Sequence, residues 1–182
     1  MKIERIVSAA KALRALDVEP AIYTFPDPDK GDDAARYAAR AAEASGVHRV
    51  IVDAEPAGGL DWTAAALDRA GAILRAAGLD VAWTTFYRRR ITAFRWPAGA
   101  MYLQVYTRIH NADDLREAIR PFAQGGREIV LCIGTHRDDD RVAADVATAA
   151  EHGTGPSVGV WCLATTSKAE GEALRAWAVA KR

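Results

Sequence analysis

The chain has 182 residues, of which 50% are hydrophobic, and its 24 lysines and arginines balance 24 aspartates and glutamates. This size predicts a single globular domain over residues 1–182. The formal net charge of zero argues against nucleic acid as an obligate partner. The apolar stretches are too short to span a membrane, and the amino terminus lacks the apolar core of a signal peptide. We therefore expect a cytoplasmic protein, or one released by a route without a signal peptide.

Strand and helix signals alternate along the chain at the spacing of a βα unit. The apolar runs predict six strands, at residues 20–25, 49–55, 80–86, 100–106, 128–135 and 157–164. Amphipathic segments predict helices at residues 3–16, 32–45, 62–77, 111–124, 138–150 and 167–181. The expected helix caps and stops are Asp32 or Asp33, Asp61, Asn111 and Ser167 at the amino ends, and Gly46 and Gly78 at the carboxyl ends.

Strands such as residues 129–133 are apolar on both faces, which is typical of parallel strands covered by helices. The sequence therefore predicts an α/β fold with a parallel-stranded, TIM-barrel-like arrangement. Six strands are too few for a complete eight-stranded barrel, which usually takes about 250 residues. We expect an incomplete or modified barrel, or a barrel completed by a second copy in a homo-oligomer, because open strand edges invite pairing. A doubly wound open sheet is the alternative, although no glycine-rich phosphate loop follows any strand.

The candidate catalytic residues are Asp53 and Glu55, which end the apolar run that begins at Val50. Residues two apart on a strand point to the same face, so the two carboxylates should lie together. The carboxyl ends of parallel strands are also where barrels and open sheets place their chemistry. Two close carboxylates are typical of glycoside hydrolysis, with Glu55 as the general acid and Asp53 as the assisting carboxylate. The alternative is that these acids only cap a helix and face solvent.

Other polar and aromatic residues follow the same strand ends and would line the same rim. Aromatic faces stack on sugar C–H groups, and amides and hydroxyls bond sugar oxygens, so the rim predicts carbohydrate binding. Neither a cofactor nor a metal ion is expected, because the two cysteines, Cys132 and Cys162, do not form a zinc motif. The candidate substrate-binding residues are Tyr23, Thr84, Tyr87, Gln104, Tyr106, His136 and Trp161.

Several of these residues have a simpler interpretation. His136 lies in a strand-to-helix loop, where a solvated histidine is common, and Trp161 fits a position in the core. The run Arg88-Arg89-Arg90 is typical of a solvated patch, with binding of phosphate or an anionic glycan as the alternative. The two cysteines are expected to be buried free thiols rather than a disulfide.

The order of these motifs resembles that of family 25 glycoside hydrolases, which are muramidase-type lysozymes on a modified barrel. The resemblance is carried by Asp53-Ala54-Glu55, by Trp83–Tyr87 and by Tyr102–Tyr106, and it covers most of the chain. Family 18 chitinase-like barrels share the Asp-x-Glu pattern. The resemblance implies hydrolysis of amino-sugar polymers such as peptidoglycan, with Asp53 and Glu55 matching the acids of the fourth strand.

The chain departs from that family at two positions. The family carries an essential acid on its first strand, and this chain begins after the matching strand. It also carries an acid on its last strand, where Val158–Thr165 contains no carboxylate. The sequence thus leads to two expectations: a glycosidase-like enzyme that lacks two of its acids, or a non-catalytic barrel-like module for glycan binding or assembly.

Overall fold

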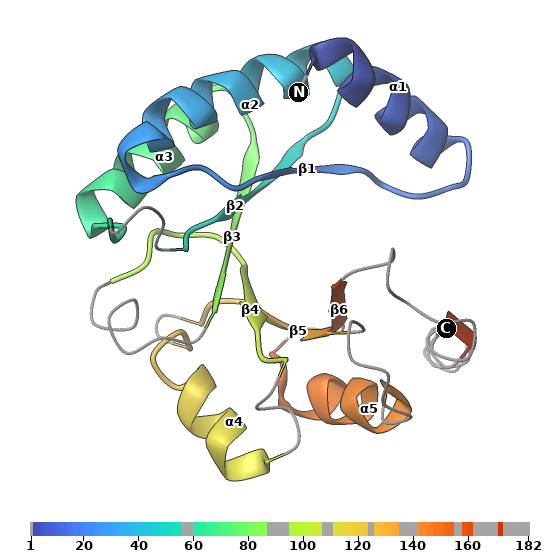
Figure 1. The fold of residues 1–182 in the computed structure, drawn as a ribbon, viewed down its shortest axis with the longest axis vertical. Coiled ribbons are helices and arrows are strands. Elements are labelled where there is room, and N and C mark those ends of the chain that lie inside the picture. The colour runs from blue at the N-terminus through green and yellow to red at the C-terminus, as the bar shows by residue number, and fades with distance from the viewer. Residues whose placement is uncertain are drawn as a thin grey trace. The chain divides into compact units, whose positions relative to one another are not determined.

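The computed structural model describes residues 2–55, 60–86, 95–106, 111–123, 126–134, 142–154, 158–161 and 171–172. Within these residues the chain forms six strands, and a helix follows each of β1, β2, β4 and β5 (Figure 1). The chain divides into two compact units, Met1–Thr85 with Ala93–Gly99, and Phe86–Thr92 with Ala100–Arg182. All described strand pairs within each unit are parallel, as the sequence predicts for an α/β fold.

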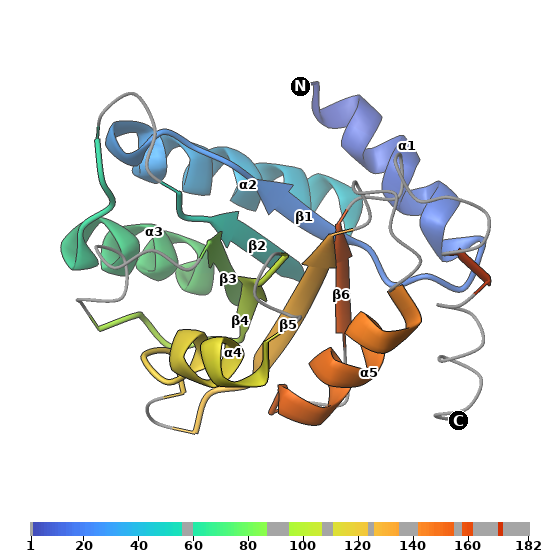
Figure 2. The ribbon, with the colours of Figure 1, turned by 60° about the horizontal axis from the view of Figure 1, so that its bottom comes forward.

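The first unit is a three-stranded parallel sheet with its helices. In the sheet, β2 lies between β1 and β3, and α2 and α3 run side by side (Figure 2). The last residue of β3 is assigned to the second unit. The elements are α1 (Ile3–Arg14), β1 (Ala21–Thr24), the 3₁₀ helix η1 (Pro28–Lys30), α2 (Gly31–Ser45), β2 (Arg49–Asp53), α3 (Ala64–Ala76) and β3 (Asp80–Phe86).

The core of the first unit lies between the sheet and these helices. Trp83 of β3 is fully buried, and a Cβ added to Gly71 of α3 would lie 3.1 Å from its ring. The Trp83 indole N–H donates to the carbonyl of Ala98 at 3.1 Å, and its ring lies 6.4 Å from that of Trp96. The segment at residues 95–99 therefore packs back onto β3 and closes this side of the core.

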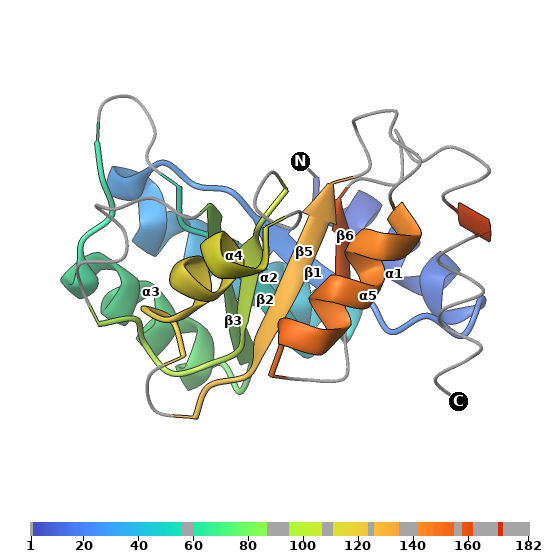
Figure 3. The ribbon, with the colours of Figure 1, turned by 90° about the horizontal axis from the view of Figure 1, so that it is seen from below.

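The second unit has the same layered construction. Its strand β5 pairs with β4 on one side and β6 on the other, and α4 and α5 lie on one side of these strands (Figure 3). Apolar residues of β4 and β5 are fully buried, including Met101, Leu103 and Leu131. The elements are β4 (Met101–Gln104), α4 (Ala112–Ile119), β5 (Ile129–Gly134), α5 (Val142–His152) and β6 (Val158–Trp161).

The carboxyl ends of α2 and α3 follow the predicted glycine signals. Gly46 directly follows α2 with a φ of +64°, and Gly78 follows α3 with a φ of +75°. Glycine adopts such backbone angles with the least strain, so it ends a helix readily. Arg14 of α1 also donates to the carbonyls of Ser45 and Gly46, at 2.9 and 2.6 Å. These bonds tie α1 to the end of α2.

Two predicted amino-terminal caps are wrong. The cap of α3 is Thr63 rather than Asp61, and its hydroxyl accepts from the Ala66 N–H at 3.1 Å. Helix α2 begins at Gly31 with no side-chain cap, and Asp32 and Asp33 lie inside its first turn. The first residue of α2 is tightly packed, because a Cβ at Gly31 would lie 2.7 Å from the ring of Trp62. In the second unit the predicted cap is confirmed, since Asn111 accepts from the Asp113 N–H at 3.0 Å.

Candidate functional site

The two faces of the sheet in the first unit have different characters. Val52 and Trp83 are register partners on neighbouring strands, and both are buried on the face that α3 covers. Asp53 and Thr84 are the next pair in the register, so their side chains point to the opposite face. The alternation of the strands therefore turns a carboxylate and a hydroxyl away from the helices, at the carboxyl ends of β2 and β3.

Asp53 is the buried centre of this polar group. Only 3% of its surface is exposed, and its Oδ2 accepts a hydrogen bond from the hydroxyl of Tyr23 on β1. Tyr23 pairs with Ile51 in the register, so its ring lies on the same face of the sheet as Ile51 and Asp53. From there its hydroxyl extends toward the carboxyl end of β2, where Asp53 lies. A carboxylate buried this deeply needs hydrogen-bond donors to offset its lost hydration. The Tyr23 hydroxyl is one such donor.

Backbone and hydroxyl contacts hold the chain just beyond β2. The Ala54 N–H donates to the Thr84 carbonyl at 2.9 Å, and the Thr85 hydroxyl donates to the Ala54 carbonyl at 3.0 Å in a buried position. The ladder between β2 and β3 thus continues one residue past Asp53. Glu55 follows directly and is half-buried. The residue before Glu55 is therefore fixed by hydrogen bonds at both its N–H and its carbonyl, which restricts where the Glu55 side chain can begin.

The second unit contains two more of the predicted residues. Gln104 is the last residue of β4 and is buried. The Val105 N–H donates to the Cys132 carbonyl at 3.1 Å, which extends the pairing of β4 with β5. Tyr106 follows, and its ring meets the ring of Phe86 edge to face at a centroid distance of 5.3 Å. Gln104 and Tyr106 therefore lie at the carboxyl end of β4, as the sequence predicts.

The predicted site residues thus fall into one group in each unit. The first group contains Tyr23, Asp53, Glu55 and Thr84, and the second contains Gln104 and Tyr106. Trp161 is the last residue of β6, and its side chain lies outside the description. Tyr87 and His136 lie outside the described residues, as do Arg88–Arg90 and Cys162. Cys132 lies on β5 and is half-buried.

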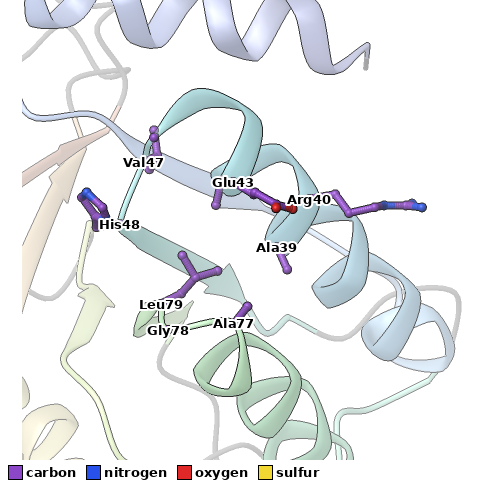
Figure 4. Close-up of a pocket in the computed structure, with 10 residues that line it drawn as sticks. Ala39, Arg40, Glu43, Val47, His48, Ala77, Gly78 and Leu79 are labelled. Atoms are coloured by element: carbon purple, nitrogen blue, oxygen red, sulfur yellow. The ribbon is translucent and has the colours of Figure 1, made fainter.

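A cleft in the first unit lies at the other end of the strands. It has a volume of about 460 Å³ and lies between the ends of α2 and α3, near the start of β2 and β3 (Figure 4). Small and apolar residues such as Ala39, Val47 and Leu79 line it, with Arg40, Glu43 and His48 among its polar residues. None of the predicted site residues lines this cleft.

The described ranges also bear on metal binding and on membrane insertion. No group of three or more histidine, cysteine, aspartate or glutamate residues is placed there to hold a metal ion. None of the helices in these ranges is long and apolar enough to cross a bilayer.

Comparison with known proteins supports the fold but does not assign the chain to a family. No family model matches the chain, and no curated protein matches it. Among solved structures, the chain is similar to a sugar phosphate isomerase/epimerase from Parabacteroides distasonis ATCC 8503. The TM-score is 0.57 at 13% sequence identity, and the match covers 97% of this chain and 77% of the other. This likeness, together with the parallel strands, confirms the predicted α/β fold of the TIM-barrel type, with six strands in the part of the chain that the structure describes.

The resemblance to family 25 glycoside hydrolases is wrong. The structural likeness is to an isomerase/epimerase rather than a lysozyme, and no glycoside hydrolase family matches. The assigned hydrolysis of peptidoglycan is therefore withdrawn, and so is the alternative of a non-catalytic glycan-binding or assembly module. The error has a physical origin. Parallel α/β folds commonly place polar residues at the carboxyl ends of their strands. An Asp-x-Glu pattern therefore indicates that a strand ends there, but it does not indicate which reaction the protein catalyses.

Two residues near this site were not singled out from the sequence. Thr85 looks like one more apolar-strand residue, but its hydroxyl bonds the carbonyl that precedes Glu55. Phe25 follows β1 and is 55% exposed, although an apolar residue there is expected to be covered. The sequence did contain a signal for the backbone of Phe25. Pro26 holds the residue before it in an extended conformation, so the side-chain alternation of β1 continues to Phe25.

Proposed function

We propose that this chain is an isomerase or epimerase of a small sugar, most simply a sugar phosphate. The observation that carries the proposal is the polar group formed by Tyr23, Asp53 and Thr84 beside Glu55, at the strand ends of the first unit. The strand ends are where enzymes of this fold class place their chemistry. The sugar phosphate isomerase/epimerase with a similar fold adds support from analogy.

The reaction requires a base that can reach a carbon-bound proton. Glu55 is half-buried and therefore accessible, so we assign it to remove the proton from the carbon beside the sugar carbonyl. The C–H electron pair then forms the double bond of an enediolate, and the carbonyl oxygen takes the negative charge. Return of the proton to the neighbouring carbon, with transfer of a hydroxyl proton between the two oxygens, gives the isomer. Epimerisation would instead need a proton delivered to the opposite face of the same carbon by a second acid or by water on that side.

Asp53 has a different role in this proposal. Because it is buried and bound by Tyr23, it is suited to hold a sugar hydroxyl rather than to move toward a carbon atom. Its carboxylate accepts hydrogen bonds, and a charged acceptor makes stronger bonds to hydroxyls than a neutral one. Asp53 would thus orient the sugar so that the proton beside the carbonyl faces Glu55.

The test is proton exchange in D₂O. The protein is incubated with five- and six-carbon aldose and ketose phosphates and with their unphosphorylated forms, and deuterium at the carbon beside the carbonyl is followed by NMR. We expect incorporation with at least one phosphorylated sugar, and a loss of about 100-fold or more in Glu55→Gln, as for removal of a general base. Asp68→Asn, a change of an exposed acid on α3, should leave the rate unchanged.

Two results would contradict the proposal. One is the absence of exchange with every sugar in the panel. The other is exchange that persists at the unaltered rate in both Glu55→Gln and Asp53→Asn, because the chemistry would then lie elsewhere on the chain.

A further inference from the structure

Phe25 is an exposed aromatic residue at the carboxyl end of an edge strand. It directly follows β1, and 55% of its surface is exposed. Exposed apolar side chains are common one at a time and need no explanation by themselves. The position of Phe25 relative to the polar group of the first unit is what gives it meaning.

The backbone places Phe25 beside Asp53. Thr24 pairs with Val52 in the register, so the next residues along the two strands, Phe25 and Asp53, lie at the same level. Pro26 restricts Phe25 to an extended conformation, and the alternation of side chains therefore continues past the end of β1. Phe25 consequently shares the face of Tyr23, two residues earlier, whose hydroxyl bonds Asp53.

The result is an exposed aromatic ring next to a buried carboxylate with its tyrosine donor. This pairing suits a molecule that has an apolar C–H surface and hydroxyls along its edge. The electron-rich face of the ring attracts C–H groups, and the carboxylate and Thr84 hydroxyl bond the oxygens. A sugar in its closed ring form has such a flat C–H face, whereas an extended open-chain sugar does not.

We propose that Phe25 is the stacking platform of this site and that it selects the ring form of the sugar. The inference rests on the proposed function only in taking a sugar as the ligand. It adds the form of sugar that binds first, and it names a residue that determines specificity without taking part in proton transfer.

The test uses ligands that cannot react. Methyl β-D-glucopyranoside and methyl β-D-galactopyranoside are locked in the ring form, and glucitol is their open-chain counterpart. Saturation-transfer NMR titrations measure their binding to the wild type, Phe25→Ala, Phe25→Leu and Phe25→Trp. We expect at least one glycoside to bind the wild type more tightly than glucitol. Its affinity should fall about tenfold in Phe25→Ala, fall in Phe25→Leu and persist in Phe25→Trp.

A matched control is Leu16→Ala, because Leu16 is another exposed apolar residue, at 74%, and lies beyond the end of α1. It should not change binding. Thermal unfolding of each variant checks that the fold is intact. Equal glycoside affinity in the wild type and Phe25→Ala would overturn the inference, and so would equal binding of glucitol and the glycosides or no glycoside binding at all.

The two proposals fail in different ways. Binding of a glycoside that depends on Phe25, with no deuterium exchange on any sugar, would overturn the isomerase proposal and leave the stacking role intact. Deuterium exchange with the same KM and kcat in Phe25→Ala as in the wild type would overturn the stacking role and leave the isomerase proposal intact.

Discussion

Asp53 and Glu55 are separated by a single residue, and their surroundings differ because β2 ends between them. Asp53 is the last residue of the strand, is 3% exposed and accepts a bond from Tyr23. Glu55 lies past the last ladder bond and is half-buried. A buried, bound carboxylate is suited to binding and orientation, and an accessible one to proton transfer. This difference divides the proposed roles between the two acids.

Replacing Tyr23 with phenylalanine tests its link to Asp53. The change removes a donor to a buried carboxylate, so we expect the free energy of unfolding to fall by about 1–3 kcal/mol. Deuterium exchange should also slow, because Asp53 would lose its fixed orientation. Urea unfolding and the exchange assay measure the two effects.

Asp53→Asn completes a double-mutant cycle. If Tyr23 acts through Asp53, the double variant should lose little more activity than Asp53→Asn alone. Additive losses from the two changes would show that Tyr23 acts independently.

We expect Thr85 to position Glu55 through the backbone. Thr85→Val keeps the shape of the side chain but removes the hydroxyl that donates to the Ala54 carbonyl. Loss of this buried bond should lower the free energy of unfolding by about 1–3 kcal/mol and reduce kcat more than it raises KM. Thr85→Ser keeps the donor and is the matched variant. A valine variant with the activity and stability of the serine variant would contradict this role.

At the scale of elements, β5 and β6 approach closely because one position carries no side chain. Cys132 and Gly159 are register partners, and a Cβ at Gly159 would overlap the Cys132 sulfur. Gly159→Ala should therefore destabilise the chain by about 1–3 kcal/mol through overpacking. Cys132→Ala should recover part of that loss when the two changes are combined, in thermal or urea unfolding. Purely additive effects on the free energy of unfolding would mean that the methyl group added by Gly159→Ala clashes with a residue other than Cys132.

The order and type of the described elements could be predicted because they depend on local patterns. Residues 80–86 alternate and are apolar enough to be assigned as a strand, and β3 has those bounds. The tight packing at the start of α2 could not be predicted in this way. A Cβ at Gly31 would clash with the ring of Trp62, which lies 31 positions further along the chain, so the local sequence pattern does not reveal this contact.

In the candidate site too, some features follow from local sequence patterns and others depend on contacts between distant residues. Alternation along β2 and β3 indicates which residues face away from the helices, so Asp53 and Thr84 could be found from the sequence. The bond between Tyr23 and Asp53 depends on the register of β1 with β2, which sequence periodicity does not specify. The reaction was wrongly assigned for a further reason, because carboxylates at strand ends serve many reactions on one fold.

At the scale of the whole molecule, two properties bear on self-association. The formal net charge is zero at pH 7, so copies of the chain do not repel one another strongly. In the first unit β1 is described as pairing only with β2, which leaves its outer edge as a place where a strand could add. Pro20 and Pro26 limit this edge to a few residues, and short edges with proline are a known protection against pairing.

We expect the open edge to outweigh this protection and give a dimer that forms as concentration rises. Ala21 is exposed on β1, and Ala21→Lys places a charge of the kind that natural edge strands use to prevent pairing. Light scattering coupled to size-exclusion chromatography should show the wild type approaching the dimer mass and Ala21→Lys remaining a monomer. Ala44→Lys, the same change at an exposed position of α2, should dimerise like the wild type. A wild-type monomer at every concentration would exclude pairing through this edge, and a dimer of Ala21→Lys would place the interface on another surface.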